Sequence, residues 1–419
     1  MAKLRDQDII SNIIIRLPVK SILQFRCVSK AWCKLLKDPD FVKKHLSHAI
    51  EMNKFSVMMH PCYDLHEKAH ALAYDPFSST LSNPASINYP LARTFWGTCN
   101  GLICLTTTSE KDVVLWNPTT KEFKEVPIES ADDFSNYKHG FGYGDEIDDF
   151  KVVSFVGFED VYFSEVRVYT LKSNSWRRLE NIPYLLCHGE MDMSQVSVHG
   201  AMHWLALSDT EPDKVIVSFD FKDDKFDEMP LPSFFHDEYA ETNLCPLGGS
   251  LCLHGSIYGC IDVWEMKEFA VTESWVKLFT IPYQADPRQL VPLQVVKNGE
   301  ILLGYDDRKG YHLDLYDLKH GTSINLKAYA NWGWYFSVTF AYVESLLPLN
   351  SGTYVGQREI ERKRLQRQGM AKLQDKNILL NILVRLPVKS ILRFRCVSKA
   401  WCKLLENPKF VKKTLEPCY

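Results

Sequence analysis

The sequence lacks any apolar run that approaches the roughly 18 to 20 residues needed to cross a bilayer, and it opens on alternating charges instead of a signal-peptide core. It also lacks an excess of positive charge, because 49 Lys and Arg stand against 52 Asp and Glu, for a formal net charge of -3. We therefore expect a soluble protein of the cytoplasm or nucleus, with neither nucleic acid nor membrane insertion among its interactions.

Signs of oxidative folding are also missing. The 12 cysteines are spread along the chain without a CxxC pair, and the Asn-x-Ser/Thr triplet at Asn117 is blocked by Pro118. This pattern argues against a disulfide framework and favours reduced thiols. With 419 residues, 46% of them apolar and 24% charged, the chain is long enough for two or three domains with substantial cores.

The most informative feature that is present is a repeat of the start of the chain near its end. Residues 12–46 align without gaps with residues 381–415, and 28 of these 35 positions are identical. Such agreement does not arise by chance. The two segments are therefore expected to fold in the same way.

Each copy predicts three short helices. Apolar residues from Ile9 to Leu17 recur at one-, three- and four-residue steps and form one apolar stripe on a first helix. Pro18 ends that helix, a second helix carries residues 22–25, and Ser29 is a candidate N-cap of a third helix that stops before Pro39. About 40 residues cannot enclose a self-sufficient core, so part of this surface needs cover, from another subunit or from the rest of the chain.

The run from Arg16 to Trp32 resembles the F-box of plant F-box proteins, the segment that binds the Skp adaptor of Skp-cullin-F-box ubiquitin ligases. The resemblance implies an adaptor-binding set that consists of Leu4, Ile9, Ile10, Ile13, Leu17, Pro18, Val19, Ile22, Leu23, Phe25, Val28 and Trp32. In the second copy, the corresponding set is Leu386, Pro387, Ile391, Leu392, Phe394, Val397 and Trp401. The family usually has a Leu-Pro pair before the first helix, where this chain has Leu4-Arg5 and Leu373-Gln374. Losing the preset φ of that proline predicts weaker adaptor binding.

The region from about residue 55 to 347 consists of short β-branched and aromatic runs between turn residues. Two markers recur in step along it. Glycine turns open apolar runs at Gly101, Gly144, Gly200, Gly249 and Gly299. The second marker is an aromatic residue with a polar residue after it at the end of a predicted strand. It occurs at Tyr74-Asp75, Trp116-Asn117, Tyr169-Thr170, Phe219-Asp220, Trp264-Glu265 and Tyr316-Asp317. Both markers repeat with a period of about 40 to 50 residues, which predicts a mainly β fold, namely a β-propeller of about six blades. The alternative is a pair of irregular β-sandwiches.

Segments 139–143, 149–153, 197–205 and 273–278 resemble the F-box-associated domain of plant F-box/kelch-repeat and S-locus F-box type proteins. Together with the helices, the resemblance spans about residues 1–350. It implies a kelch-like propeller that selects a target protein for a ligase, with the Skp adaptor and, through it, the cullin and RING subunits as partners. Such a receptor is not an enzyme and needs no cofactor or metal, since tethering alone raises the local concentration of target lysines.

Target contacts are expected on loops at one propeller face, and aromatic candidates lie in loop-like stretches: Phe158, Tyr162, Phe234, Phe235, Trp332 and Trp334. Packing in the core or at an edge explains each of them more simply. A glycan- or ligand-binding, lectin-like propeller that acts outside a ligase is the alternative function.

Metal or catalytic sites find little support. Residues 66–70 fit the HExxH pattern of zinc proteases, but that pattern works on a helix, and nearby prolines and weak amphipathicity argue against one. His199 and His203 are four residues apart in a predicted strand, where their side chains do not converge on a metal. His45 and His48 fall on a lysine-rich segment and are expected to be solvated.

The predicted order of domains is an F-box at 1–50, a propeller at 55–347, a basic linker at 348–369 and a second F-box at 370–419. Residues 370–373 repeat Met1-Ala2-Lys3-Leu4. This repetition suggests a tandem duplication in which two reading frames were joined.

Overall fold

The computed structural model describes residues 13–355, apart from 62–68, 91–93, 108–111, 127–135, 159–160, 187–194, 209–213, 233–234, 236–239, 258, 283–287, 297–298, 307–309 and 330–335. The chain divides into two compact units, Met1–Val355 and Gly356–Tyr419. The second unit lies outside the described residues, and with it the predicted second set from Leu386 to Trp401.

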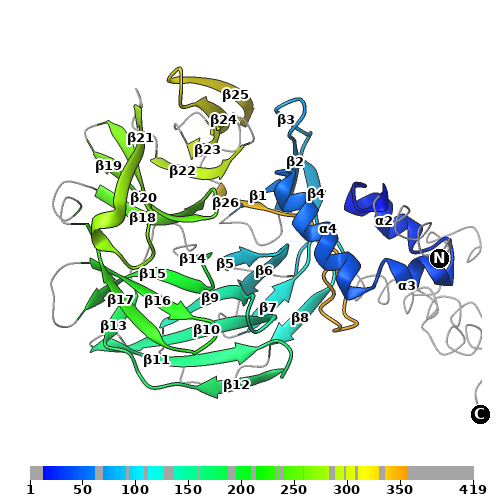
Figure 1. The fold of residues 1–419 in the computed structure, drawn as a ribbon, viewed down its shortest axis with the longest axis horizontal. Helices are drawn as coiled ribbons and strands as arrows, with labels where there is room; N and C mark the ends of the chain where they lie inside the picture. Colours follow the sequence, from blue (N-terminus) through cyan, green and yellow to red (C-terminus); the bar gives the residue numbers. More distant parts are fainter. Residues whose placement is uncertain are drawn as a thin grey trace, which may run out of the picture. The chain divides into compact units, whose positions relative to one another are not determined.

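The described part of the chain begins with helices. They are α2 (Val19–Phe25), α3 (Lys30–Leu35) and α4 (Pro39–Glu51), drawn in blue in Figure 1. The second predicted helix and the Ser29 cap are confirmed, since the Ser29 hydroxyl accepts the backbone N–H of Trp32 at 3.2 Å. The third predicted helix is α3, and it ends at Leu35, before Pro39, as predicted. A further helix that was not predicted, α4, begins at Pro39, where proline is well tolerated, and Asp38 caps that helix.

Six antiparallel sheets follow within the described residues, and each is one blade. Blade 1 is β26 (Phe336–Tyr342), β1 (Ser56–Pro61), β2 (Ala69–Asp75) and β3 (Thr80–Leu81), with β4 (Ala85–Ile87) beside β2; blade 2 is β5 (Thr94–Cys99), β6 (Leu102–Thr106), β7 (Val113–Trp116) and β8 (Phe123–Val126); blade 3 is β9 (Asn136–Gly144), β10 (Asp149–Phe158), β11 (Val161–Thr170) and β12 (Ser175–Arg178). Blade 4 is β13 (Tyr184–Leu186) and β14 (Gln195–Val198), both paired with β15 (Ala201–Ser208), then β16 (Lys214–Asp220) and β17 (Phe226–Pro230); blade 5 is β18 (Ala240–Leu247), β19 (Ser250–Ile257), β20 (Cys260–Met266) and β21 (Trp275–Pro282); blade 6 is β22 (Arg288–Val295), β23 (Ile301–Asp306), β24 (Tyr311–Asp317) and β25 (Thr322–Tyr329).

The ring is closed by strands from opposite ends of the propeller sequence. In blade 1, β1 pairs with β26, with Ser56 opposite Tyr342 and Met59 opposite Thr339. The first strands of neighbouring blades contact one another, as β5 contacts β9 and β18 contacts β22. The fold is therefore a six-bladed β-propeller. The predicted blade number is confirmed, and the sandwich alternative is wrong.

The two sequence markers correspond to two turns that recur in the blades. The marker glycines lie between the first and second strands, and four of them adopt φ of +74° to +87°, namely Gly101, Gly200, Gly249 and Gly299. The aromatic-polar pairs lie at or near the end of each third strand. There the Asn117 carboxamide oxygen accepts the backbone N–H groups of Thr119 and Thr120 at 2.9 and 3.1 Å. Asp75, Asp220 and Asp317 form the same kind of turn.

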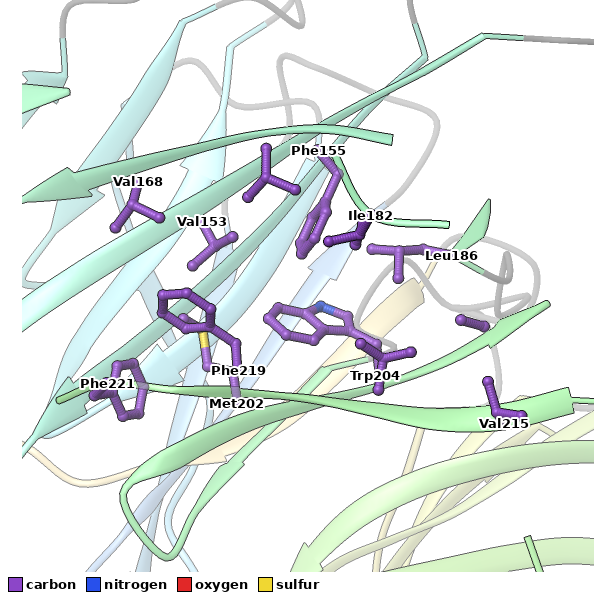
Figure 2. Close-up of a cluster of buried hydrophobic side chains, with 13 residues drawn as sticks. Val153, Phe155, Val168, Ile182, Leu186, Met202, Trp204, Val215, Phe219 and Phe221 are labelled. Carbon is purple, nitrogen blue, oxygen red and sulfur yellow. The ribbon is translucent and has the colours of Figure 1, made fainter. Parts of the chain in front are cut away.

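The core lies between the blades. Figure 2 shows side chains of β10 and β11 pointing toward those of β15 and β16, with the Trp204 ring close to Phe155. The two rings pack edge to face, with centroids 4.9 Å apart. Because each sheet alternates its side chains between two faces, every blade packs against both of its neighbours.

A segment without regular structure, residues 343–355, continues after β26, and we call it the C-terminal strap. Its backbone is bound by the turn between β7 and β8: the Asn117 amide group donates to the carbonyls of Ser345 and Leu347 at 3.2 and 2.9 Å. The Glu122 carboxylate accepts the backbone N–H groups of Leu349 and Ser351, both at 2.9 Å. Blade 2 thus fixes the path of the strap.

Candidate functional site

The helical module, residues 13–51, has a small core of its own. Ile14, Val19, Ile22 and Leu36 are at most 3% exposed and pack together with residues of α4. At its edge the Phe25 and Trp32 rings stack, with centroids 5.6 Å apart. This core is completed from outside the module by Leu346 of the C-terminal strap.

The predicted adaptor-binding residues of the first copy fall into several environments. Leu4, Ile9 and Ile10 lie outside the described residues, and Val19 and Ile22 are buried in the core of the module. Leu17, Leu23, Phe25 and Trp32 are partly exposed and pack against that core. Pro18 is exposed, as are Ile13 at 60% and Val28 at 65%. The rest of the chain therefore covers part of these helices through the strap, while Ile13 and Val28 stay exposed.

The helical module contacts the propeller at one end of its blades. Lys43 of α4 forms an ion pair with Asp148, in the turn between β9 and β10. The Asn53 amide group donates to the Val295 carbonyl at the end of β22, at 2.8 Å. Hydrogen bonds from Lys43, Tyr143 and Lys172 hold the pKa of Asp148 well below its usual range, so this carboxylate stays charged.

The position of His45 differs from the one predicted. It was expected to be solvated, but it is 4% exposed on the inner side of α4. Its Nε2 lies 3.1 Å from the Leu17 carbonyl, and burial lowers its pKa. The sequence signal that could have placed it inside is its four-residue spacing from Phe41 and Ala49, which are also buried on that face. His48, one residue before Ala49, is partly exposed.

The predicted target contacts are only partly described. Phe235 is 2% exposed and packs in a core cluster with Met229 and Leu244, so core packing explains it. Phe158 and Tyr162 belong to β10 and β11. Phe234, Trp332 and Trp334 lie outside the described residues.

Phe158 ends the strand that begins at Asp149, next to the turn that meets Lys43. Since a strand rises about 3.3 Å per residue, these two ends of β10 are separated by roughly 30 Å. The end of β10 at Phe158 and the start of β11 at Val161 therefore lie at the end of the blade opposite the helical module.

The possible metal ligands do not come together in the described ranges. His70, the last residue of the HExxH pattern, lies in β2 opposite Met59 rather than on a helix, and residues 66–68 are outside the description. His203 is buried in β15, where burial lowers its pKa to about 4. Among the described residues, no group of three or more His, Cys, Asp or Glu side chains has the arrangement of a metal site. The same residues include no helix long and apolar enough to span a membrane.

The residues that attach the strap were not predicted from sequence. Asn117 belongs to the aromatic-polar marker Trp116-Asn117, but that marker predicted a turn and not a contact with the strap. Glu122 had no comparable signal, since its partners Leu349 and Ser351 are more than 220 positions away.

Comparison with known proteins agrees with these two parts. The F-box associated beta propeller domain matches residues 52–349, and the F-box domain matches residues 6–44 and 375–413. An F-box/kelch-repeat protein of Arabidopsis thaliana is 28% identical over 337 residues, which span 75% of this chain and 88% of that protein. The F-box protein CPR1 of the same plant is 29% identical over 307 residues, which span 65% of this chain and 72% of that protein. An oligogalacturonate lyase from Vibrio parahaemolyticus superposes with a TM-score of 0.38 at 8% identity over 65% of this chain and 79% of that one, a likeness too distant to bear on function.

Proposed function

Because the chain belongs to the family of F-box proteins with an F-box associated β-propeller domain, we propose that it is a substrate-recognition subunit of a Skp-cullin-F-box ubiquitin ligase. In this proposal the predicted domains at 1–50 and 55–347 divide the work. The helices bind a Skp-family adaptor, and the propeller holds a target protein. The chain supplies no catalytic group, and ubiquitin transfer follows from proximity to the cullin and RING subunits.

The observation that carries the proposal is the pair of uncovered apolar side chains on the helical module. Ile13 is 60% exposed and Val28 is 65% exposed, and both belong to the predicted adaptor-binding set. Burying a side chain of this size stabilises a complex by about 1.5 to 3 kcal/mol. In the proposal these exposed members touch the adaptor, while Val19 and Ile22 hold the helices in place from inside.

The arrangement of the propeller supports a division between two ends. Lys43 of the helical module meets Asp148, and Asn53, just after α4, meets Val295 at the end of β22, so adaptor and cullin would approach from that side. Phe158, the last residue of β10, lies at the other end. We assign target binding to that end, where a bound protein does not compete with the adaptor for space.

The test is the affinity of the full chain for a purified Skp-family adaptor. Ile13→Asp and Val28→Asp are each expected to weaken binding by at least about tenfold, because a charge would replace buried apolar surface. Ile50→Asp is the matched control, since Ile50 is 53% exposed on α4 outside the predicted set, and it should change the affinity by less than about twofold. Equal loss in all three variants, or none in any, would contradict the assignment.

A second adaptor site at 370–419 is part of the proposal. The predicted basic linker, 348–369, precedes it, and residues 348–355 of that range belong to the strap. The sequence repeat and the F-box match at 375–413 support it. With excess adaptor, the full chain should bind two adaptors, and deletion of residues 370–419 should reduce this to one. A one-to-one complex in both cases would exclude a working second copy. If a pull-down from cells recovers binding partners only in a sugar-dependent way and without cullin, a lectin-like receptor is favoured instead.

A further inference from the structure

A cavity of about 240 Å³ lies where the helical module meets blade 1, and residues of both parts line it. The helical module contributes Leu17, Pro18 and Val19, all members of the predicted adaptor-binding set. The propeller contributes residues 73–77, which form the end of β2 and the turn after it. The surface around the predicted adaptor-binding residues therefore continues from the helices onto the propeller.

The most exposed apolar side chain in this lining is Phe77. It is 79% exposed, more than any other large apolar side chain in the described part of the chain. A single exposed apolar side chain is ordinary on a protein surface, but Phe77 borders one cavity together with the exposed Pro18. The two parts of the chain thus present a joint apolar surface of the kind that marks a protein-protein contact.

The turn that presents Phe77 is held in one conformation. The Asp75 carboxylate accepts the backbone N–H of Phe77 at 3.0 Å and the Ser78 hydroxyl at 2.7 Å. These bonds lower the pKa of Asp75, so its carboxylate stays charged at neutral pH. Because the backbone is already fixed, Phe77 loses little conformational freedom when a partner covers it.

The two sides of the cavity are also fixed relative to each other. The Lys54 ammonium group, between α4 and β1, donates to the Arg16 carbonyl at 3.2 Å. Within the cavity, the Phe55 and Tyr74 rings stack with centroids 4.7 Å apart, which makes that part of the wall a firm apolar surface. An adaptor that touches Pro18 therefore meets blade 1 in a defined position.

The surroundings and the volume of the cavity indicate what enters it. His48, Lys54 and Asp75 also line the cavity and are at least partly exposed, so polar groups accompany an apolar interior. This is the usual composition of a protein interface, with an apolar centre and a polar rim. A cavity of about 150 Å³ accepts benzene, so a cavity of 240 Å³ accepts one side chain of the size of Leu or Phe.

We propose that the adaptor interface extends onto blade 1, where one apolar side chain of the Skp-family adaptor enters this cavity and contacts Pro18 and Phe77 together. The inference rests on the proposed function, since it takes the adaptor as the partner. It adds that the propeller itself contributes to adaptor binding. Phe77 is then an adaptor contact that lies outside the helical module.

Photo-crosslinking of the full chain tests the contact directly. With p-benzoylphenylalanine in place of Phe77, irradiation in the presence of a purified Skp-family adaptor should join the two proteins covalently. The same replacement of Phe269, which is 48% exposed in the turn between β20 and β21 of blade 5, is the matched control and should give no adaptor crosslink. Adaptor crosslinks from both positions alike, from neither, or crosslinks from position 77 only to a second copy of this chain would overturn the proposal.

Affinity for the adaptor provides a second test. Phe77→Asp and Ala73→Leu are each expected to weaken binding by at least about fivefold, because the first removes apolar contact and the second fills the cavity. Both positions are exposed, so both variants should fold, and Phe269→Asp should change the affinity by less than about twofold.

The variants of the helical module separate this inference from the proposed function. If Ile13→Asp and Val28→Asp weaken adaptor binding while Phe77→Asp and Ala73→Leu leave it unchanged, the contribution of blade 1 is wrong and the proposed function stands. If none of the four variants weakens binding, the proposed function fails and this inference fails with it.

Discussion

The attachment of the C-terminal strap at Glu122 is a defined point at which to disturb the structure. Glu122 is 5% exposed and accepts hydrogen bonds from the Leu349 N–H, the Ser351 N–H and the Ser351 hydroxyl, at 2.9, 2.9 and 3.2 Å. In Glu122→Gln one oxygen is retained and the other becomes an NH₂ group, which faces a donor. Because a hydrogen bond to a charged group contributes about 1.5 to 3 kcal/mol, we expect this change to destabilise the strap by about 2 to 3 kcal/mol.

Hydrogen exchange with mass spectrometry measures this loss locally. A cost of 2 to 3 kcal/mol corresponds to a fall in amide protection of about 30- to 140-fold in peptides that contain Leu349 and Ser351. Since Leu346 of the same strap completes the core of the helical module, peptides from α2 should also exchange faster. Glu125→Gln on β8 is the matched control, because Glu125 is exposed, and it should shift protection by less than about 0.5 kcal/mol. Unchanged strap exchange in a folded Glu122→Gln protein would refute the attachment described above.

Three further predictions concern packing, turns and thiols. Phe155→Ala should lower the free energy of unfolding by about 3 to 5 kcal/mol in urea titration, because it leaves a cavity between blades 3 and 4, and a loss below 1 kcal/mol would contradict the packing in Figure 2. Gly101→Ala should lower the free energy of unfolding by at least about 2 kcal/mol more than Gly299→Ala. Both glycines have φ of +80°, but only at Gly101 would a Cβ clash with neighbouring atoms, the Ser345 Cβ at 2.3 Å and the Val343 carbonyl oxygen at 2.6 Å. Equal thermal stability of the two variants would refute this. Iodoacetamide at pH 8 should alkylate the exposed Cys27 in the native protein but should react with Cys104 only after unfolding, because Cys104 is buried and burial raises its pKa. Mass spectrometry measures both reactions, and equal rates of modification at Cys104 and Cys27 in the native protein would contradict that burial.

The fold was largely predictable because its turns repeat. Each blade needs a tight turn between its first two strands and another after its third strand, and few residues suit those conformations. Gly200 and Gly249 supply positive φ at the first turn, and Asn117 and Asp317 bind turn N–H groups at the second. Such local requirements are visible in a single sequence at the period of the blade.

The candidate site was less predictable because it depends on contacts between distant segments. Val19 and Ile22 were expected to face the adaptor, yet Leu346, more than 300 residues later, helps to bury them. His45 was expected to be solvated, since its neighbours Lys43 and Lys44 are exposed, but one face of α4 lies against Leu17. Apolar character alone does not tell which side of a short helix is covered by its own chain.

The central claim is that an adaptor covers the side of the helical module that the strap leaves open. Hydroxyl-radical footprinting of the full chain, with and without a saturating Skp-family adaptor, measures that cover residue by residue. We expect the oxidation of Ile13 and Val28 to fall severalfold in the complex, whereas Ile50 and Phe269, which are 53% and 48% exposed, react as before. Undiminished oxidation of Ile13 and Val28 in a verified complex would show that the adaptor does not cover them.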